Sequence, residues 1–152
     1  MKKVLVASNN LGKIREIGGI LAELDIVVVG QKALAIGEVQ ETGMTFIENA
    51  LIKARHAAQQ SGLPALADDS GLEVDALGGK PGVYSARFAG EHATDADNNR
   101  HLMESLKDHE SSALTARFRC VMVYLRHPED PSPVIGQGTW EGEIVREPRG
   151  HG

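Results

Sequence analysis

The chain has 152 residues, and 16 Lys plus Arg against 21 Asp plus Glu give it a formal net charge of −5. This length suffices for one domain with a hydrophobic core, and an acidic chain without a basic run is not expected to bind nucleic acid. A single cysteine excludes an internal disulfide framework, and no apolar run approaches the roughly 18 residues that span a bilayer, so we expect a cytoplasmic protein with no membrane contact.

The first elements alternate between strand and helix patterns. Residues 2–7 form a short apolar run typical of a buried strand, and from Lys13 onward apolar residues recur at helical spacing. The β-branched run 26–29, which ends at Gly30, predicts a second strand.

Two further helices carry start signals. Thr45 and Glu48 match the capping-box pattern ahead of an apolar face, and Gly62 and Pro64 predict where that helix ends. The run 63–67 predicts a buried strand that ends before the acidic residues. A third helix is predicted from Thr94, because acidic residues fill its first turn.

The last third of the chain has strand character. Residues 113–127, "ALTARFRCVMVYLRH", alternate and are rich in β-branched and aromatic residues, and "PEDPSP" predicts a turn before a second strand that runs through Val134, Trp140 and Ile144. Helices early and neighbouring strands late predict a mixed α/β sheet flanked by helices. The chain stops on the glycine-rich "REPRGHG", so we expect one domain, residues 1–152, that is incomplete at its C-terminus.

The segment "VLVASNNLGK", residues 4–13, is the first candidate for ligand binding. A strand that leads through Ser8, Asn9, Asn10 and Gly12 into a helix near Lys13 presents hydroxyl, amide and backbone N–H groups where the helix dipole favours an anion. An ordinary turn between a strand and a helix, with Lys13 in solvent, would have the same sequence.

The segment "ETGMTFIENALIKA", residues 41–54, is the second candidate. Asn49 and Lys53 are four residues apart on one helical face, which could present an amide and a cation to a ligand. Glu41 would supply a carboxylate from the preceding loop. Taken singly, Glu41 as a surface acid and Lys53 as a solvated lysine are the simpler interpretations.

The third candidate is "LADDSGLEVD", residues 66–75. Successive strand residues point to opposite faces, so one of Asp68 and Asp69 would bind a ligand and the other would support it. The pattern alone does not show which of the two binds. Ser70 could donate to an oxygen, and Gly71 would let the chain turn. A solvated turn is the alternative, but two carboxylate-bearing segments beside a phosphate-binding loop favour Mg²⁺.

Together these three segments resemble one known family. Ser8, Asn10 and Lys13, then E-T-G-x-T-F-x-E-N-A-x-x-K-A from Glu41, then A-D-D-S-G-L from Ala67, are similar to the inosine/xanthosine triphosphate pyrophosphatase family, and "LGGKPGVYSARFAG" resembles its bacterial members. The likeness runs in order over essentially the whole chain. Three spaced motifs together are specific, although each alone would be weak.

The resemblance implies a two-lobed α/β fold with the active site in a cleft between the lobes, usually as a homodimer. It implies Mg²⁺-dependent hydrolysis of non-standard purine nucleoside triphosphates (ITP, dITP, XTP) to the monophosphate and pyrophosphate. It assigns Glu41 and Asp69 to the metal, Asp69 also to general-base catalysis, and Asp68 to a supporting role. The residues that it assigns to substrate binding are Ser8, Asn9, Asn10, Leu11, Gly12, Lys13, Lys53 and Ser70.

The end of the chain departs from the family pattern. Family members continue with an F-G-Y-D segment, a later lysine and an S-H-R segment, which recognise the base, whereas this sequence stops at Gly152. Two alternatives therefore stay open: a nucleotide-binding protein with little or no turnover, and a phosphohydrolase of similar fold that acts on modified pyrimidine nucleotides.

Overall fold

The structure is a computed structural model that describes residues 2–109 and 114–146. The turn expected at residues 147–152 lies outside this part. The α-helices are α1 (Leu11–Ala22), α2 (Phe46–Ser61) and α3 (Asp95–Leu106). The strands are β1 (Lys2–Val6), β2 (Ile26–Gly30), β3 (Ala65–Val74), β4 (Lys80–Pro81), β5 (Leu114–Leu125) and β6 (Val134–Ile144). Short 3-10 helices are η1 (Gln31–Leu34), η2 (Asp75–Leu77) and η3 (Gly82–Arg87).

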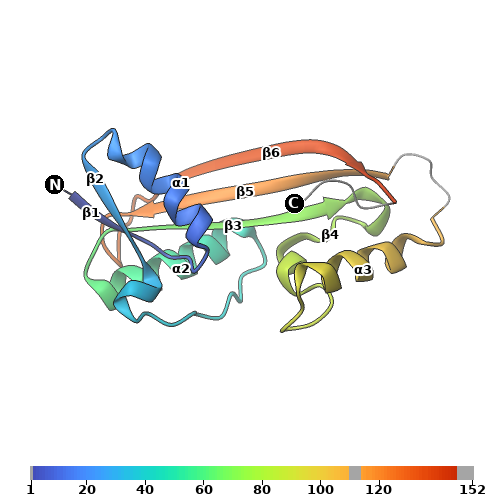
Figure 1. The fold of residues 1–152 in the computed structure, drawn as a ribbon, viewed down its shortest axis with the longest axis horizontal. Coiled ribbons are helices and arrows are strands. Elements are labelled where there is room, and N and C mark those ends of the chain that lie inside the picture. Colours follow the sequence, from blue (N-terminus) through green and yellow to red (C-terminus); the bar gives the residue numbers. More distant parts are fainter. Residues whose placement is uncertain (1, 110–113, 147–152) are drawn as a thin grey trace. The chain divides into compact units, whose positions relative to one another are not determined.

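The strands form one mixed sheet in the order β2-β1-β3-β5-β6, and β4 pairs with β3 (Figure 1). Strand β1 runs parallel to both β2 and β3, whereas β4 is antiparallel to β3. The predicted mixed α/β class is therefore confirmed. Val6 of β1 pairs with Leu66 of β3. Ser8 and Asp68 each lie two residues further along the chain, so they are at the same level of the sheet, where β1 has ended.

The described residues form two compact units. Unit 1 lies in Met1–Asp69 and Val121–Gln137, and unit 2 lies in Ser70–Cys120 and Gly138–Gly152. The boundaries fall inside β3, β5 and β6, so each of these three strands contributes residues to both units.

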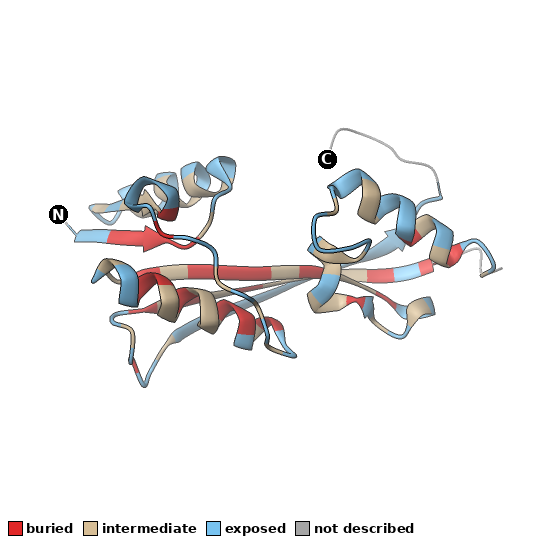
Figure 2. Cartoon of the chain, turned by 90° about the horizontal axis from the view of Figure 1, so that it is seen from below, coloured by how far each residue is buried: buried red, intermediate tan, exposed pale blue. Residues whose placement is uncertain are grey.

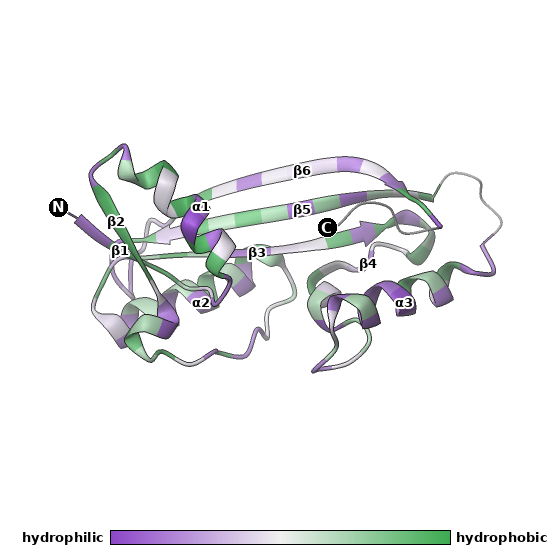
Figure 3. Ribbon diagram, viewed as in Figure 1, coloured by the Kyte–Doolittle hydropathy of each residue, from purple (hydrophilic) through white to green (hydrophobic). Residues whose placement is uncertain are grey.

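The core of unit 1 is built from β1, β3, β5 and α2. Figure 2 shows α1 and α2 on opposite sides of β1, and α1 has no buried residue. Figure 3 shows the apolar run of β2, which contacts α1. The fully buried residues of α2 are small, which lets the helix pack closely on the strands. They are Ala50, Ala54, Ala57 and Ala58, together with Asn49.

The start signals of the helices are confirmed, with one difference. The Thr45 hydroxyl caps α2 by accepting from the Glu48 N–H at 3.1 Å. The Glu48 carboxylate accepts from the Thr45 hydroxyl at 2.9 Å, and not from the Thr45 N–H as in a capping box. Helix α2 ends at Gly62, where φ is +70°, a left-handed conformation that glycine adopts without strain. Thr94 and Asp97 complete a reciprocal capping box on α3.

The expected end of β3 was wrong. The strand was predicted to stop at Ala67 and the chain to turn at Gly71, but β3 continues through both acidic residues to Val74. In unit 2 its last residue joins a cluster of buried apolar residues from α3 and β5. The cluster consists of Val74, Leu102, Leu106, Leu114 and Ala116. Within the described residues, no helix is both long and apolar enough to cross a membrane.

Candidate functional site

The turn between β1 and α1 is organised by its own side chains. The Ser8 hydroxyl accepts from the Asn10 N–H at 3.0 Å, and the Asn10 side-chain oxygen accepts from the Lys13 N–H at 3.0 Å. Asn10 is thus the N-cap of α1. Its oxygen holds the helix start in place, while Leu11, the first helical residue, is largely exposed.

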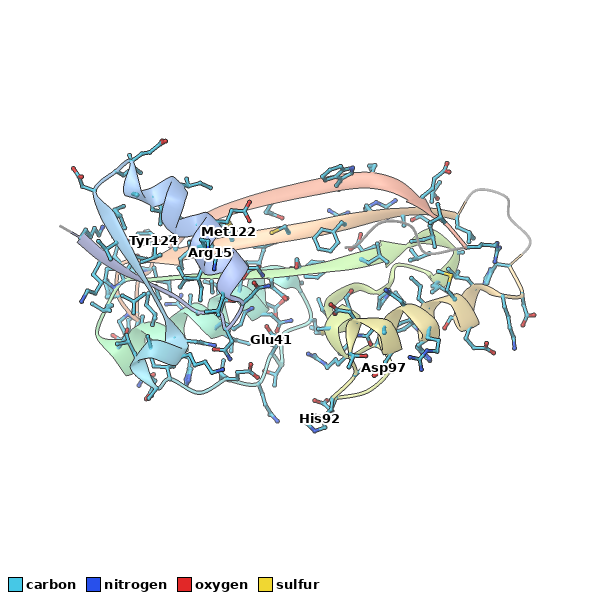
Figure 4. All side chains as sticks on the ribbon, in the orientation of Figure 1. Arg15, Glu41, His92, Asp97, Met122 and Tyr124 are labelled. Carbon is cyan, nitrogen blue, oxygen red and sulfur yellow. The ribbon has the colours of Figure 1, made fainter. Side chains whose placement is uncertain are left out.

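A pocket of about 220 Å³ lies in unit 1, at the edge of the sheet where β1 and β3 deliver their polar residues. Six of the residues singled out from the sequence line it. They are Ser8, Asn9, Lys13, Glu41, Lys53 and Asp68. Three separate parts of the chain therefore meet at one pocket: the turn after β1, the segment around α2, and β3. Figure 4 marks Glu41 in the loop that leads into α2.

Two ion pairs order the charges of this pocket. The Lys13 ammonium lies 2.6 Å from an Asp68 carboxylate oxygen, and the Lys53 ammonium lies 3.1 Å from a Glu41 oxygen. The Asp68 side chain is only 9% exposed, whereas that of Lys13 is 35% exposed. Glu38 adds a third carboxylate to the lining. Two lysines thus face three carboxylates, and a polyanion would meet net repulsion unless a cation entered with it.

The pocket offers oxygen donors of the kind that a hard divalent cation prefers. Its carboxylates are oxygen donors from Glu38, Glu41 and Asp68. No group of three or more His, Cys, Asp or Glu side chains that could hold a metal exists in the part of the chain that the structure describes. A site with so few ligands would suit a cation such as Mg²⁺, which is usually held by one or two carboxylates, with water and substrate phosphates completing its shell.

Asp69 and Ser70 lie outside this pocket. Asp68 and Asp69 are both buried and adjacent on β3, so their side chains leave the strand on opposite faces. Only Asp68 is among the residues that line the pocket of unit 1. Ser70 lines a different pocket of about 400 Å³ in unit 2, with apolar neighbours that include Phe88 and Phe118. Asn10, Leu11 and Gly12 do not line the pocket of unit 1 either. The roles assigned to these residues stay predictions.

The sequence did not single out the other five residues of the pocket: Ala7, Gln31, Glu38, Val39 and His56. Gln31 is buried and donates to the Asn9 side-chain oxygen at 3.2 Å, and the Asn9 amide donates to Glu38 at 3.0 Å. A signal for Gln31 was present, because it follows β2, whose end lies at the same sheet edge as the end of β1. A signal for His56 was its position three residues after Lys53 on α2.

Known proteins resemble this chain along its whole length. The model of the Ham1 family matches residues 4–152. The chain is 55% identical over 152 residues to a Shigella flexneri protein named dITP/XTP pyrophosphatase, covering 100% of this chain and 77% of that protein. A protein of the same name from Thioalkalivibrio sulfidiphilus is 55% identical over 150 residues, which cover 99% of this chain and 76% of that protein.

Solved structures agree with these matches. A HAM1 protein from Coxiella burnetii superposes with a TM-score of 0.92 at 48% identity, over 99% of this chain and 76% of that chain. The Ham1 protein of Staphylococcus aureus superposes with a TM-score of 0.85 at 39% identity, again over 99% and 76%. The chain thus spans about three quarters of the length of these relatives. The matches confirm the family that the three motifs indicated: the chain belongs to the Ham1 family.

Proposed function

We propose that this chain hydrolyses non-standard purine nucleoside triphosphates, ITP, dITP and XTP, to the monophosphate and pyrophosphate. The observation that carries this proposal is the pocket of unit 1, in which Lys13 and Lys53 lie beside Glu41 and Asp68. Relatives that are 55% identical over the whole chain are named dITP/XTP pyrophosphatase, which supports the substrate class.

The residues of the pocket have distinct roles in this proposal. Lys13 and Lys53 bind phosphate oxygens, together with Ser8 and the backbone of the turn that precedes α1. Glu41, which lines the pocket, and Asp69, which does not, would hold Mg²⁺, and Asp68 would keep Lys13 in position through their ion pair. When bound, the metal neutralises phosphate charge and polarises the phosphoryl oxygens.

Proton transfer is assigned to Asp69. Water is a weak nucleophile toward a polyanion, so a carboxylate must take its proton as the new bond to phosphorus forms. The bond between the α-phosphate and the bridging oxygen then breaks, and pyrophosphate leaves with the electron pair. Lys13 and Lys53 stabilise the charge on the departing group.

The test measures pyrophosphate release from ITP with Mg²⁺ for the natural chain and for Asp69→Asn. We expect the variant to lose roughly 10²–10⁴-fold in turnover, the usual contribution of a general base, with an unchanged circular dichroism spectrum. Glu104→Gln, on the surface of α3, is the control for a neutralised carboxylate. Turnover of Asp69→Asn equal to that of the natural chain would rule out the assigned role.

Metal and substrate class are tested with the same assay. Removal of divalent cations by EDTA should abolish release, and Mg²⁺ should restore it. A panel of ITP, dITP, XTP, GTP, ATP and modified pyrimidine triphosphates separates the proposed activity from hydrolysis of pyrimidine nucleotides. Binding of ITP without pyrophosphate release would instead identify a nucleotide-binding protein.

The proposal includes a homodimer in the cytoplasm. The first part is tested by sedimentation velocity over a range of concentrations, where a monomer at every concentration would contradict it. Fractionation of cells that express the natural chain tests the second part.

A further inference from the structure

The segment between η1 and α2, residues 35–45, contains no helix or strand and carries Glu41 into the pocket. We call it the 35–45 loop. A loop without secondary structure must be fixed by other contacts if its carboxylate is to stay in place. Asn9 donates to Glu38 from the turn after β1, and the contacts on either side of Glu41 come from one face of α2.

Besides Glu48, which takes part in the cap with Thr45, three residues of α2 contact the loop, at positions 49, 53 and 56. Their spacing of four and three residues places them on a single helical face. The side-chain oxygen of Asn49 accepts from the Gly43 N–H at 2.7 Å, and Lys53 pairs with Glu41 at 3.1 Å. The His56 ring lies 3.2 Å from the Gly37 carbonyl, and because a carbonyl only accepts, its Nε2 carries the proton.

The contacts run in opposite order along the two segments. Moving toward the C-terminal end of α2, each contact meets a residue earlier in the loop: residue 43, then 41, then 37. The loop therefore lies antiparallel along the helix face. Glu41 sits between two hydrogen bonds that do not involve its own side chain.

Asn49 is the most enclosed of the three contacts. It is 0% exposed, and within the described residues its side-chain nitrogen has no hydrogen-bond partner, so the bond to Gly43 is the amide's one described side-chain interaction. A side chain at Gly43 would bring a Cβ within 2.6 Å of the Glu48 Cβ and 2.7 Å of the Asn49 oxygen. Only glycine allows the loop to approach this closely.

Resting on the proposed function, we propose that Asn49 and His56 are positioning residues for the metal-binding carboxylate of Glu41. In that function Lys53 turns to phosphate and Glu41 turns to the cation, so their mutual ion pair is lost on binding. The contacts of Asn49 and His56 survive this exchange, because neither uses the Glu41 side chain. They keep the 35–45 loop in place when the ion pair between Lys53 and Glu41 is broken.

The decisive comparison is Asn49→Leu against Asn49→Asp. Leucine has a similar size but no acceptor, whereas aspartate keeps an oxygen for the Gly43 N–H. Position 49 is the fourth residue of α2, where the helix dipole offsets part of the cost of burying a carboxylate. Asn49→Asp should therefore retain the contact and Asn49→Leu should lose it.

The first readout needs neither substrate nor metal. Hydrogen exchange of the Gly43 amide, followed by NMR, should speed up about tenfold or more in Asn49→Leu, the factor that corresponds to about 1.4 kcal/mol. In Asn49→Asp the exchange should stay close to that of the natural chain. Unchanged exchange in Asn49→Leu would overturn the proposal.

The second readout is divalent-cation binding without nucleotide, with Mn²⁺ as a spectroscopic probe. We expect its dissociation constant to rise about tenfold in Asn49→Leu and to recover in Asn49→Asp. Thr94→Ala, which removes a comparable acceptor of a backbone N–H on α3, is the control for general destabilisation and should leave Mn²⁺ binding unchanged. Equal weakening in Thr94→Ala and Asn49→Leu would mean a purely structural role and would refute the assignment.

His56 gives an independent test should Asn49→Leu fail to fold. His56→Gln keeps a donor for the Gly37 carbonyl and His56→Leu does not, so only His56→Leu should weaken Mn²⁺ binding. Equal binding in both variants would contradict the role of His56. These readouts do not involve turnover, so they separate a failure of this inference from a failure of the proposed pyrophosphatase activity.

Discussion

The ion pair between Lys13 and Asp68 can be tested by replacing Lys13 with methionine, which keeps the apolar stem and removes the charge. The carboxylate of Asp68 would then stay 9% exposed with no counter-ion at 2.6 Å. Glu38 and Glu41 line the same pocket and add like charge. We therefore expect Lys13→Met to lower the free energy of unfolding, because a buried carboxylate loses its partner.

The magnitude follows from the exposure of the two side chains. Exposed pairs contribute about 0–1 kcal/mol, and removing one partner of a fully buried pair costs about 3–5 kcal/mol. Since Lys13 is 35% exposed and Asp68 is 9% exposed, an intermediate loss of about 2 kcal/mol is expected. Lys107 and Glu104 form a surface pair with side chains 59% and 67% exposed, so Lys107→Met should cost about 0.5 kcal/mol or less.

Urea unfolding followed by circular dichroism measures both losses. The double variant Lys13→Met/Asp68→Asn completes the cycle, and neutralising Asp68 should restore about 1 kcal/mol relative to Lys13→Met alone. A loss for Lys13→Met no larger than that for Lys107→Met would refute this account of the pocket. If the losses of Lys13→Met and of Asp68→Asn alone add up to the loss of the double variant, the account is refuted as well.

Two further predictions concern stability away from the pocket. Hydrogen bonds from Arg126 and from the Ser132 N–H hold the pKa of Asp130 well below its usual value. Its contribution is therefore complete above about pH 4 and lost as the pH falls further, so the stability difference between Asp130→Asn and the natural chain should shrink between pH 7 and pH 3 in urea unfolding; a constant difference would contradict this. Thr94→Ala removes the N-cap of α3 and should lower the free energy of unfolding by about 1 kcal/mol in the same assay. An unchanged free energy of unfolding would show that this cap does not stabilise the protein.

Local signals in the sequence predicted most helices and strands. The Thr45 and Thr94 caps, the glycine after α2 and the apolar run of β1 act within a few residues, so a single chain segment contains the whole cause. The true length of β3 depended on a distant partner. Polar residues after Ala67 are typical of a turn, but Asp68 is stabilised inside the strand by Lys13, 55 residues earlier.

The pocket shows the same limit. Asn9 could be selected from the turn after β1, but its partners Gln31 and Glu38 lie 22 and 29 residues away and belong to no recognisable motif. The residues proposed to contact the ligand occupy motif positions, whereas the residues that orient Asn9 are placed by the packing of other elements. The sequence therefore predicted six pocket residues and missed those that orient Asn9.

The paired charges of the pocket have a consequence for how ligands enter it. Without a ligand, Lys13 and Lys53 are each paired with a carboxylate, so each lysine of the pocket has a counter-ion. In the proposed function the pair of Lys13 and Asp68 is kept, and the pair of Lys53 and Glu41 is the one that opens. A polyanion alone would have to separate Lys53 from Glu41, leaving that carboxylate uncompensated, and a cation alone would leave Lys53 uncompensated. When both enter together, Lys53 and Glu41 each exchange one partner for another, so the arrangement favours joint binding of metal and polyphosphate over the binding of either one.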